Sequence, residues 1–477
     1  MNEALGTAES LDIDPRVLVQ APYRSILRLA TPTVIAMLTQ SAVNEIDVIF
    51  FSHLPCPTGG LCESSNGQAA LLPSLIIVWL FGGSLSAISV GTQALTARRY
   101  AEKNYDAAGA VLANAVFFCF VAGILTMLLG AFAIPKLLGA MIEVPEVRAT
   151  AVAYSQWRLM GIMSMAMTQA IKAFFDGIGK THVHLVAAVV MNICNVAMCF
   201  SFIFGNFGAP RLGAPGAGLA AFIATWIGLF IILIYAWNDR HRYRPMRLSN
   251  LSFRLTWDLL RLSVPAAIAT SVMMFGFGLF SSIVGKLDAM EGRGAAEAVN
   301  SAATTDIIAI LKLTFTACIA FGTSTATLVS QSLGAKLPDH AVKFGWASVR
   351  LGLVIFGVVG LCEGVLFTGP IVNFISHSDA VREVTMGPMR MMGVVTPIIA
   401  VAMILSEALF GAGNTRFVAL AQLILIFGLL VPGAQLLGVN ARWGLMGIWT
   451  SACAYAVLAA VTMTLKFRAG GWKKIKL

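Results

Sequence analysis

The segment FFDGIGKT at residues 174–181 returns in altered form as ALFGAGNT at residues 408–415. The first copy holds the last three positions of the phosphate-binding pattern G-x-x-x-x-G-K-[ST], but Phe174 stands where that pattern needs its first glycine. The second copy keeps both glycines and the threonine, and it has Asn414 in place of Lys180. Each copy closes a long apolar stretch, so we predict a glycine-capped turn that ends a helix, and no nucleotide site.

The composition of the chain places it in a membrane. Of its 477 residues, 58% are hydrophobic and 12% are charged, with a mean hydropathy of +0.81, whereas soluble domains carry about 25% charged residues. A helix needs ~20 apolar residues to cross the hydrocarbon, and backbone groups in lipid must bond within their own segment. We therefore predict an all-α integral membrane protein with twelve transmembrane helices, near residues 26–52, 69–97, 108–134, 151–178, 183–206, 213–238, 259–285, 305–333, 343–369, 388–411, 417–437 and 443–468.

The two copies of the opening segment belong to a duplication of the whole chain. RLATPTVIAML (28–38) matches RLSVPAAIATS (261–271), and ALTARRYAEKNYDAA (94–108) matches TLVSQSLGAKLPDHA (327–341), each pair with a shift of 233 residues (28 to 261, 94 to 327). Each half has an even number of spans, so the two repeats insert with the same orientation and are parallel. We expect an N-terminal lobe at residues 1–237, a cytoplasmic linker at 238–258 and a C-terminal lobe at 259–477.

The placement of basic residues predicts the orientation of the chain. Of 33 Lys and Arg, 22 fall in the N-terminus, the even-numbered connections and the C-terminus, nine fall on the other side, and Lys172 and Lys312 lie within spans. By the positive-inside rule, both termini are cytoplasmic. The net charge of +10 therefore reflects anionic membrane lipid as a partner, with no nucleic acid. We expect a multi-pass protein of the plasma or inner membrane that works as a monomer.

Two of the eight cysteines differ from the rest. Six lie singly in apolar spans, where they act as small packing residues. Cys56 and Cys62 bracket CPTGGLC in the first outer loop, which lacks Lys and Arg and lies on the side where disulfides persist. A disulfide between them would staple the loop and carry no chemistry, and the sequence leaves both the bridged and the free state open.

Polar side chains on two spans predict a buried cation-binding chamber. Gln40, Asn44 and Asp47 are spaced i, i+4, i+7 and share one helical face. Asn192 and Asn195 likewise share a face of the fifth span. Lipid penalises such faces, so they point into the N-terminal lobe. The functional interpretation is a proton- or cation-binding chamber with Asp47 as the titrating carboxylate, and the structural alternative is a hydrogen-bonded network that holds the lobe together.

Charges in other spans are candidates for a substrate cavity or a gate. Lys312 and Glu363 both lie about 10 Å below the outer surface, where they either pair or line the cavity. Lys172 and Glu407 occupy nearly equivalent positions in the two repeats, which suggests an ion pair that holds the inner gate closed. Methionines suit a cavity for varied apolar substrates. The residues assigned to the cavity or gate are Lys172, Gln169, Lys312, Glu363, Glu407 and Met273.

A set of short segments falls at corresponding spans of the two halves. They are Pro32 and Pro265 early in the first helix of each half, NEIDVIFFSHL (44–54), GTQALTARRYAEKNYDAA (91–108), GTSTATLVSQSLGAK (322–336), the two G-x-G-x-T turns and Asn195. With these segments in this order, the chain resembles the multidrug and toxic compound extrusion (MATE) transporters over most of its length. The resemblance implies a V-shaped pair of six-helix lobes that exports organic, often cationic or amphipathic, compounds in exchange for protons or sodium.

The resemblance also bears on the coupling ion. Proton-linked members use an Asp late in the first helix and polar residues in the fifth, which supports Asp47 and Asn195. Those members often carry an acidic residue one turn after the Asn, where this chain has Cys199. The sodium-linked branch uses acidic residues in the seventh and tenth helices, where this chain has Met273 and Ile399. Proton coupling through Asp47 is favoured over sodium, and no metal or prosthetic cofactor is expected.

Other functions are weighed against this one. A flippase for a lipid-linked precursor or polysaccharide shares the two-lobe architecture, but it is expected to carry a more cationic cavity than Lys172 and Lys312 provide. An enzyme is not expected, because no H-E-x-x-H, G-x-S-x-G or paired Asp motif lies in a span. The sequence therefore predicts a secondary antiporter that exports a small organic compound or metabolite by alternating access.

Overall fold

A computed structural model describes residues 19–55, 63–142, 144–244, 250–290, 298–376, 378–475 and 477, and in this part of the chain the regular structure is helical throughout. Cys56 and Cys62, and with them the predicted disulfide, lie outside the described residues. The helices of the first half are α2 (Pro22–Ser52), α3 (Glu63–Ser86), α4 (Ile88–Ala101), α5 (Tyr105–Met141), α6 (Pro145–Met160), α7 (Ile162–Gly177), α8 (Thr181–Phe204) and α9 (Ala214–Asn238). They are followed by α10 (Arg240–Tyr243), α11 (Phe253–Met290), α12 (Val299–Gly334), α13 (Pro338–Leu361), α14 (Thr368–Ile375), α15 (Asp379–Gly411), α16 (Thr415–Leu425), α17 (Val431–Gly433) and α18 (Gly444–Ala469).

The prediction of twelve spans is confirmed, with one of them interrupted. Eleven helical segments of the described part are long and apolar enough to cross a membrane. The remaining predicted span, 151–178, is divided at Gly161 into α6 and α7, of 16 residues each. The hydroxyl of Ser164 donates a hydrogen bond to the carbonyl of Gly161 at 2.9 Å. The same carbonyl also accepts from the backbone N–H of Met165 at 3.0 Å, so the break leaves it paired within the membrane.

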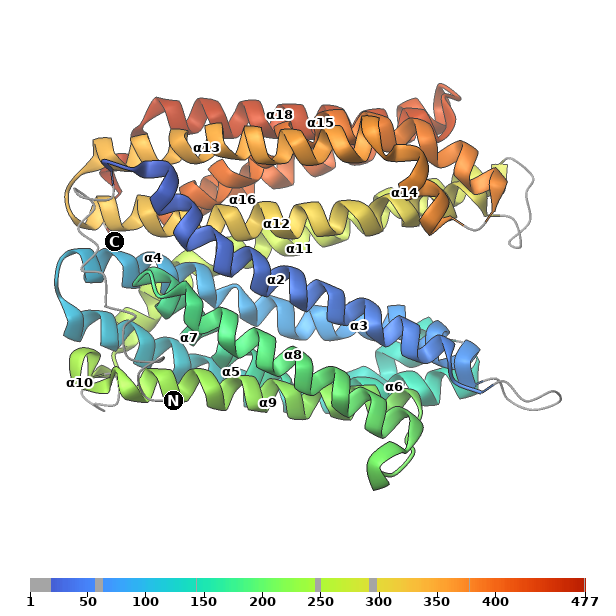
Figure 1. The fold of residues 1–477 in the computed structure, drawn as a ribbon, viewed down its shortest axis with the longest axis horizontal. Helices are drawn as coiled ribbons and strands as arrows, with labels where there is room; N and C mark the ends of the chain where they lie inside the picture. Colours follow the sequence, from blue (N-terminus) through green and yellow to red (C-terminus); the bar gives the residue numbers. More distant parts are fainter. Residues whose placement is uncertain are drawn as a thin grey trace.

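The helices form two lobes, and α2 crosses between them (Figure 1). Near its start, Ile26 and Leu29 belong to the same buried apolar cluster as Phe321 of α12. Near its end, Phe51 packs edge-on against Tyr154 of α6, with ring centroids 6.2 Å apart. One helix thus contributes to the core of both lobes.

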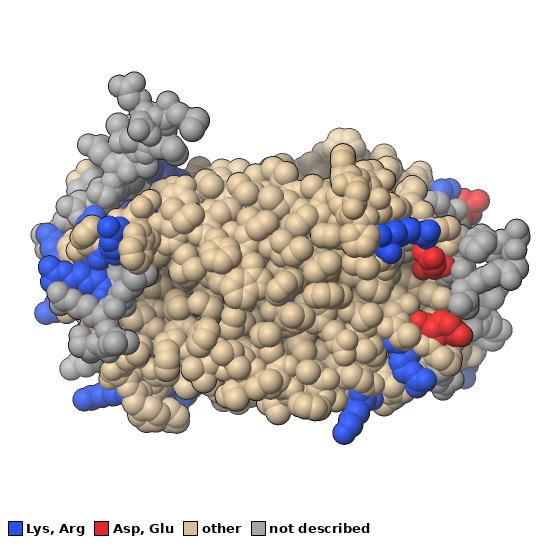
Figure 2. All heavy atoms as spheres, turned by 90° about the horizontal axis from the view of Figure 1, so that it is seen from below, with Lys and Arg blue, Asp and Glu red and all other residues tan. Residues whose placement is uncertain are grey.

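Charged side chains gather at the two ends of the molecule, and the face drawn in Figure 2 has a wide middle zone without them. Lipid favours such an uncharged belt. One end holds the end of α4, with Arg98 and Arg99, together with Lys103 and α10, with Arg240 and Arg242. We call this the basic end.

The two G-x-G turns end α7 and α15, as predicted. The N–H groups of Lys180 and Asn414 each bond to the carbonyl five residues earlier, at 2.8 and 2.9 Å. Gly179 and Gly413 have φ of 83° and 85°, a left-handed conformation that glycine adopts without steric cost. This is the hydrogen-bond pattern of a helix C-terminal cap, so the capping interpretation of the opening segment is confirmed.

A glycine pair tests how closely the second turn packs. A Cβ on Gly411 would overlap the backbone of Ala326 on α12, whereas a Cβ on Gly278 of α11 would meet nothing within 4 Å. We predict that Gly411→Ala destabilises the purified protein by ~1–3 kcal/mol through overpacking. Gly278→Ala should leave stability unchanged or raise it, because alanine favours helix. Thermal unfolding followed by tryptophan fluorescence checks this, and equal melting of the two variants would contradict the close approach.

Candidate functional site

Polar side chains of α4 and α12 join the two lobes near the basic end. Gln93 of α4 donates from Nε2 to the carbonyl of Thr323 and to Oγ1 of Thr327, both at 2.8 Å. Ser330 of α12 donates to the carbonyl of Ala94 at 2.8 Å. Gln93 and Ser330 are buried, so these bonds lie in an interface closed to water. We call this interface of α4, α12 and the two G-x-G turns the seam.

Two longer contacts of the seam reach the helix-ending turns. Gln331 of α12 donates from Nε2 to the carbonyl of Gly177 at 2.8 Å. Arg98 of α4 donates from Nη2 to the carbonyl of Ala412 at 2.9 Å. Arg98 and Gln331 are equivalent in the two repeats (98 to 331), and both acceptors lie at helix C-termini, where carbonyls lack partners within the helix. Each lobe thus satisfies a helix end of the other lobe.

The lobes are joined most tightly at the basic end. Farther from that end, an inter-lobe hydrogen bond joins the hydroxyls of Ser41 on α2 and Thr316 on α12, at 3.4 Å. From there toward the opposite end the ribbons of the two lobes diverge (Figure 1). The seam therefore closes one end of the path between the lobes.

The residues assigned to the cation site lie on α2 and α8, which pack against each other. Asn195 is 9% exposed, and its Oδ1 accepts a long hydrogen bond of 3.5 Å from the thiol of Cys199. Gln40 is half-buried on α2. Asn44 and Asp47 lie on the same helix, but their side chains are outside the described part of the structure. Their role in a cation site stays a prediction.

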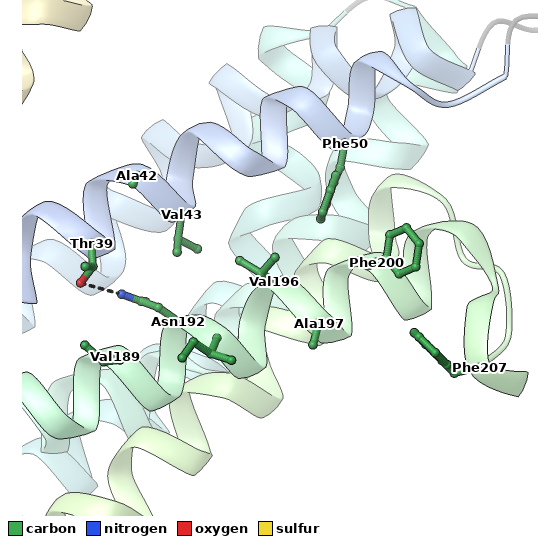
Figure 3. Close-up of a pocket in the computed structure, with 11 residues that line it drawn as sticks. Thr39, Ala42, Val43, Phe50, Val189, Asn192, Val196, Ala197, Phe200 and Phe207 are labelled. Carbon is green, nitrogen blue, oxygen red and sulfur yellow. Dashed lines mark hydrogen bonds between the residues drawn. The ribbon is translucent and has the colours of Figure 1, made fainter.

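Asn192 makes a contact that the sequence did not predict. Its Nδ2 donates to Oγ1 of Thr39 at 3.2 Å (Figure 3). Thr39 uses its own hydroxyl hydrogen on the carbonyl of Ala36, at 2.8 Å, so it can only accept from the amide. This orients the amide and leaves Oδ1 of Asn192 buried and without a hydrogen-bond partner among the described residues. Such an unpaired acceptor costs about 1–3 kcal/mol.

A pocket of about 730 Å³ lies beside this pair, between α2 and α8 (Figure 3), and it is open to the surface of the lobe along the exposed side chains of Ile193, Phe200 and Phe207. This volume falls within the ~300–1,000 Å³ of small-molecule sites. Thr39 and Asn192 are the polar members of its described lining. The rest of the lining is apolar and consists of Ala42, Val43, Phe50, Val189, Ile193, Val196, Ala197, Phe200 and Phe207. The cavity therefore combines an apolar body with one buried polar corner.

The charges on α7 and α15 are arranged differently from the predicted gate pair. Nζ of Lys172 lies 3.6 Å from Oδ2 of Asp176, one turn along the same helix, and both side chains are largely buried. Glu407 packs against Gly322 of α12 and lies within electrostatic reach of Lys172. The ion-pair partner of Lys172 in the structure is thus Asp176 rather than Glu407. Lys172 and Asp176 lie one turn apart on α7, so the distance between them does not depend on how the two lobes are placed.

The remaining candidates do not converge on one site. Glu363 accepts a hydrogen bond from the hydroxyl of Thr314, at 2.8 Å on its Oε1. Lys312 lies exposed on α12, and Gln169 is half-buried on α7. Met273 packs against an apolar cluster of the second lobe. The sequence analysis did not identify the seam residues. The polar residues Arg98 and Gln331 occupy equivalent positions in the two repeats, and this equivalence was a sequence feature that pointed to them.

Two parallel repeats, a seam that joins them at one end and a cavity within one lobe define a membrane transporter of the two-lobe class. A family model for MatE matches residues 32–201 and again residues 265–435. The chain therefore belongs to the MATE family of transporters, and each half carries one copy of the family's unit.

Curated relatives match nearly the whole chain. The "Probable multidrug resistance protein NorM" of Thermotoga maritima is 22% identical over 474 residues, covering 96% of this chain and 95% of the relative. The "Multidrug resistance protein PmpM" of Pseudomonas aeruginosa is 22% identical over 469 residues, covering 96% and 93%.

Solved structures share the fold. An "Outward-facing conformation of a multidrug resistance MATE family transporter of the MOP superfamily" aligns with a TM-score of 0.84 at 19% identity, covering 96% of this chain and 97% of that one. A MATE crystal structure in complex with MaL6 aligns with a TM-score of 0.85 at 19% identity, covering 96% and 98%.

The seam predicts how one substitution changes the closed state. Gln331→Leu removes the donor to Gly177 and leaves that carbonyl unpaired, at a cost of about 1–3 kcal/mol. We expect faster amide hydrogen exchange in peptides of α4, α12 and both turns, measured by mass spectrometry in lipid nanodiscs. Gln435→Leu is the matched control, because the one side-chain hydrogen bond of Gln435 in the described part of the chain is to Asn440, on an exposed surface. Unchanged exchange in the seam of Gln331→Leu would show that this bond does not hold the lobes together.

Proposed function

We propose that this protein is a secondary antiporter that exports organic cationic or amphipathic compounds in exchange for protons by alternating access. The observation that carries the proposal is the seam, which joins two parallel repeats at one end only. In this proposal the basic end faces the cytoplasm, as the positive-inside rule favours, and the seam closes the cytoplasmic side of the path between the lobes. Relatives named as multidrug resistance proteins support organic compounds as cargo. In the other half of the cycle the seam opens.

Asp47 is the proposed coupling group. A charged carboxylate in the hydrocarbon costs at least ~2.5 kcal/mol, and it is relieved by a proton or by a cationic substrate. A single carboxylate does not need both at once, so binding of one favours release of the other. Met273 and Ile399, in place of the acidic residues of sodium-linked relatives, favour the proton. In this scheme the chain works as a monomer in the plasma membrane.

Asp47→Asn tests the coupling. The amide keeps the size of the side chain but takes no proton. We therefore expect the rate of transport across the proteoliposome membrane, driven by a pH gradient, to fall at least tenfold, which corresponds to a free-energy difference of about 1.4 kcal/mol or more. Export is measured with ethidium under separate pH and sodium gradients. Asp379→Asn is the control, since that carboxylate is exposed and pairs with Arg382. Normal export by Asp47→Asn, or export driven by sodium alone, would overturn the assignment.

The cavity between α2 and α8 is the proposed substrate cavity. Its apolar walls suit the body of an amphipathic molecule, and the unpaired Oδ1 of Asn192 at its polar corner favours a substrate with an N–H or O–H donor. A phospholipid chain fits less well, because a terminal methyl would leave this acceptor unpaired. The substrate class is therefore compact, largely apolar and donor-bearing.

Binding of two lipophilic cations distinguishes the loss of a hydrogen bond to Asn192 from a general loss of the folded structure. Ethidium carries aromatic N–H donors, and tetraphenylphosphonium has none. We predict that Asn192→Leu weakens ethidium binding about five- to tenfold, the worth of one hydrogen bond, and leaves tetraphenylphosphonium binding unchanged. Binding is measured by fluorescence and by equilibrium dialysis on protein in nanodiscs. Val190→Leu, on the same helix but outside the cavity lining, is the control, and equal loss of both ligands in Asn192→Leu would exclude a donor-specific contact.

A further inference from the structure

The segment that follows α18 folds back onto the second lobe. Gly470 turns the chain with φ of 72°, and Trp472 beyond it is completely buried. The Trp472 ring stacks on Phe467, with centroids 4.7 Å apart and planes at 21°, and its Nε1 donates to the carbonyl of Phe467 at 2.8 Å. Nζ of Lys473 lies 3.4 Å from Oδ1 of Asp339 on α13. This segment is therefore anchored to the second lobe.

Arg98 of the first lobe holds this segment and the second lobe together. Its Nη1 donates to the carbonyl of Ile475 at 2.7 Å, and its Nη2 donates to the carbonyl of Ala412 at 2.9 Å. Arg98 is 7% exposed, and the C-terminal end of the chain lies beside α4 (Figure 1). Leu477 packs against Gly413 in the same G-x-G turn. One buried cation from α4 thus bridges two separate pieces of the other lobe.

The repeat symmetry accounts for only one of these two bonds. Gln331, the equivalent of Arg98, bonds to the turn after α7 just as Arg98 bonds to the turn after α15. The second arm of Arg98, to Ile475, has no counterpart at Gln331. The negative end of the α15 dipole favours a cation at Ala412, and hydrogen bonds to a charged donor are stronger than neutral ones. We therefore expect the hydrogen bonds of Arg98 to contribute more to the stability of the closed seam than those of Gln331.

We propose that residues 470–475, together with Leu477, form a latch that holds the seam closed, with Arg98 as the residue on which it closes. The basic end opens only when Arg98 leaves both carbonyls, so the latch sets the balance between the two states of the transporter. This inference rests on the proposed alternating access, because a latch has a role only if the seam opens.

The test measures the seam directly, without substrate or gradient. Spin labels replace the exposed Lys103 and Lys336, which occupy equivalent places beside the seam, in a full chain whose native cysteines are replaced. Electron–electron distance distributions in nanodiscs then give the fractions of closed and open seam. Arg98→Gln, which installs the residue of the other repeat, and deletion of residues 471–477 should each raise the open-to-closed ratio about tenfold. Arg99→Gln is the control, since Arg99 pairs only with Glu102 on the surface.

Combining Arg98→Gln with the deletion shows whether the two changes act on the same contact or weaken the seam independently. If Arg98 acts through the segment, Arg98→Gln has a smaller effect in the deletion background than in the full chain. Trp472→Ala, which loosens the anchor without touching Arg98, should shift the ratio in the same direction and serves if Arg98→Gln does not fold. Independent, multiplying effects, or ratios equal to that of Arg99→Gln, would overturn the latch. A seam that stays closed in every variant, and in wild type with ethidium, would overturn alternating access and the latch with it.

Discussion

Carbonyl groups at the ends of helices within a membrane protein need partners, and this constraint organises the seam. α7 and α15 both end in a G-x-G turn, and the outermost carbonyls of each turn have no N–H donor within their own helix. In this protein the donors come from the opposite lobe, through Gln331 and Arg98. The same bonds that complete two helices therefore also join two lobes, so the lobes cannot separate without leaving polar groups unpaired or wet.

The pseudo-symmetry of the two repeats explains why each lobe bonds to a helix end of the other. The departure from symmetry at Arg98 explains why the two sets of bonds differ in strength. Gln331 and Arg98 are equivalent, and each bonds to the helix-ending turn of the other lobe; likewise, the close approach of Gly411 to Ala326 matches that of Gly177 to Gln93. Arg98 departs from this symmetry because its second arm bonds to Ile475. A perfectly symmetric seam would hold both lobes with the same bonds, whereas the long, charged side chain of Arg98 adds a bond to the segment that follows α18.

The seam is suited to opening as well as to closing. A neutral hydrogen bond contributes about 1 kcal/mol net, so a few such bonds hold a state without trapping it. Opening of the basic end would hydrate these groups, and bonds to water would compensate much of the lost hydrogen-bond energy. The buried Lys172–Asp176 pair lies on one helix and survives separation of the lobes. Reversible contacts are thus placed between lobes and the costly charged pair within one of them, which suits a two-state machine.

Local patterns predicted much of the fold. Apolar runs of sufficient length predicted twelve spans, glycine spacing predicted the turns after α7 and α15, and repeat matching predicted two lobes. The interruption at Gly161 was missed because the backbone stays hydrogen-bonded on both sides of it: the N–H of Gly161 bonds to the carbonyl of Arg158, and the carbonyl of Gly161 accepts from the N–H of Met165. Such a break leaves no mark in the composition. In the candidate site, the burial of Asn192 and Asn195 followed from helical spacing, whereas the Thr39 partner of Asn192 did not.

The amino-acid sequence by itself determined the membrane class, the duplication and the helix-capping turns, because these depend on hydrophobicity and on backbone preferences within a few residues. Only the tertiary structure decided which groups meet across the lobes: Gln331 with Gly177, and Arg98 with Ala412 and Ile475. It also decided that Lys172 pairs within α7, with Asp176, and not across the lobes with Glu407. The physical reason is that equivalent segments of the two repeats have the same local preferences, whereas the partner of a long polar side chain depends on how two whole lobes are placed.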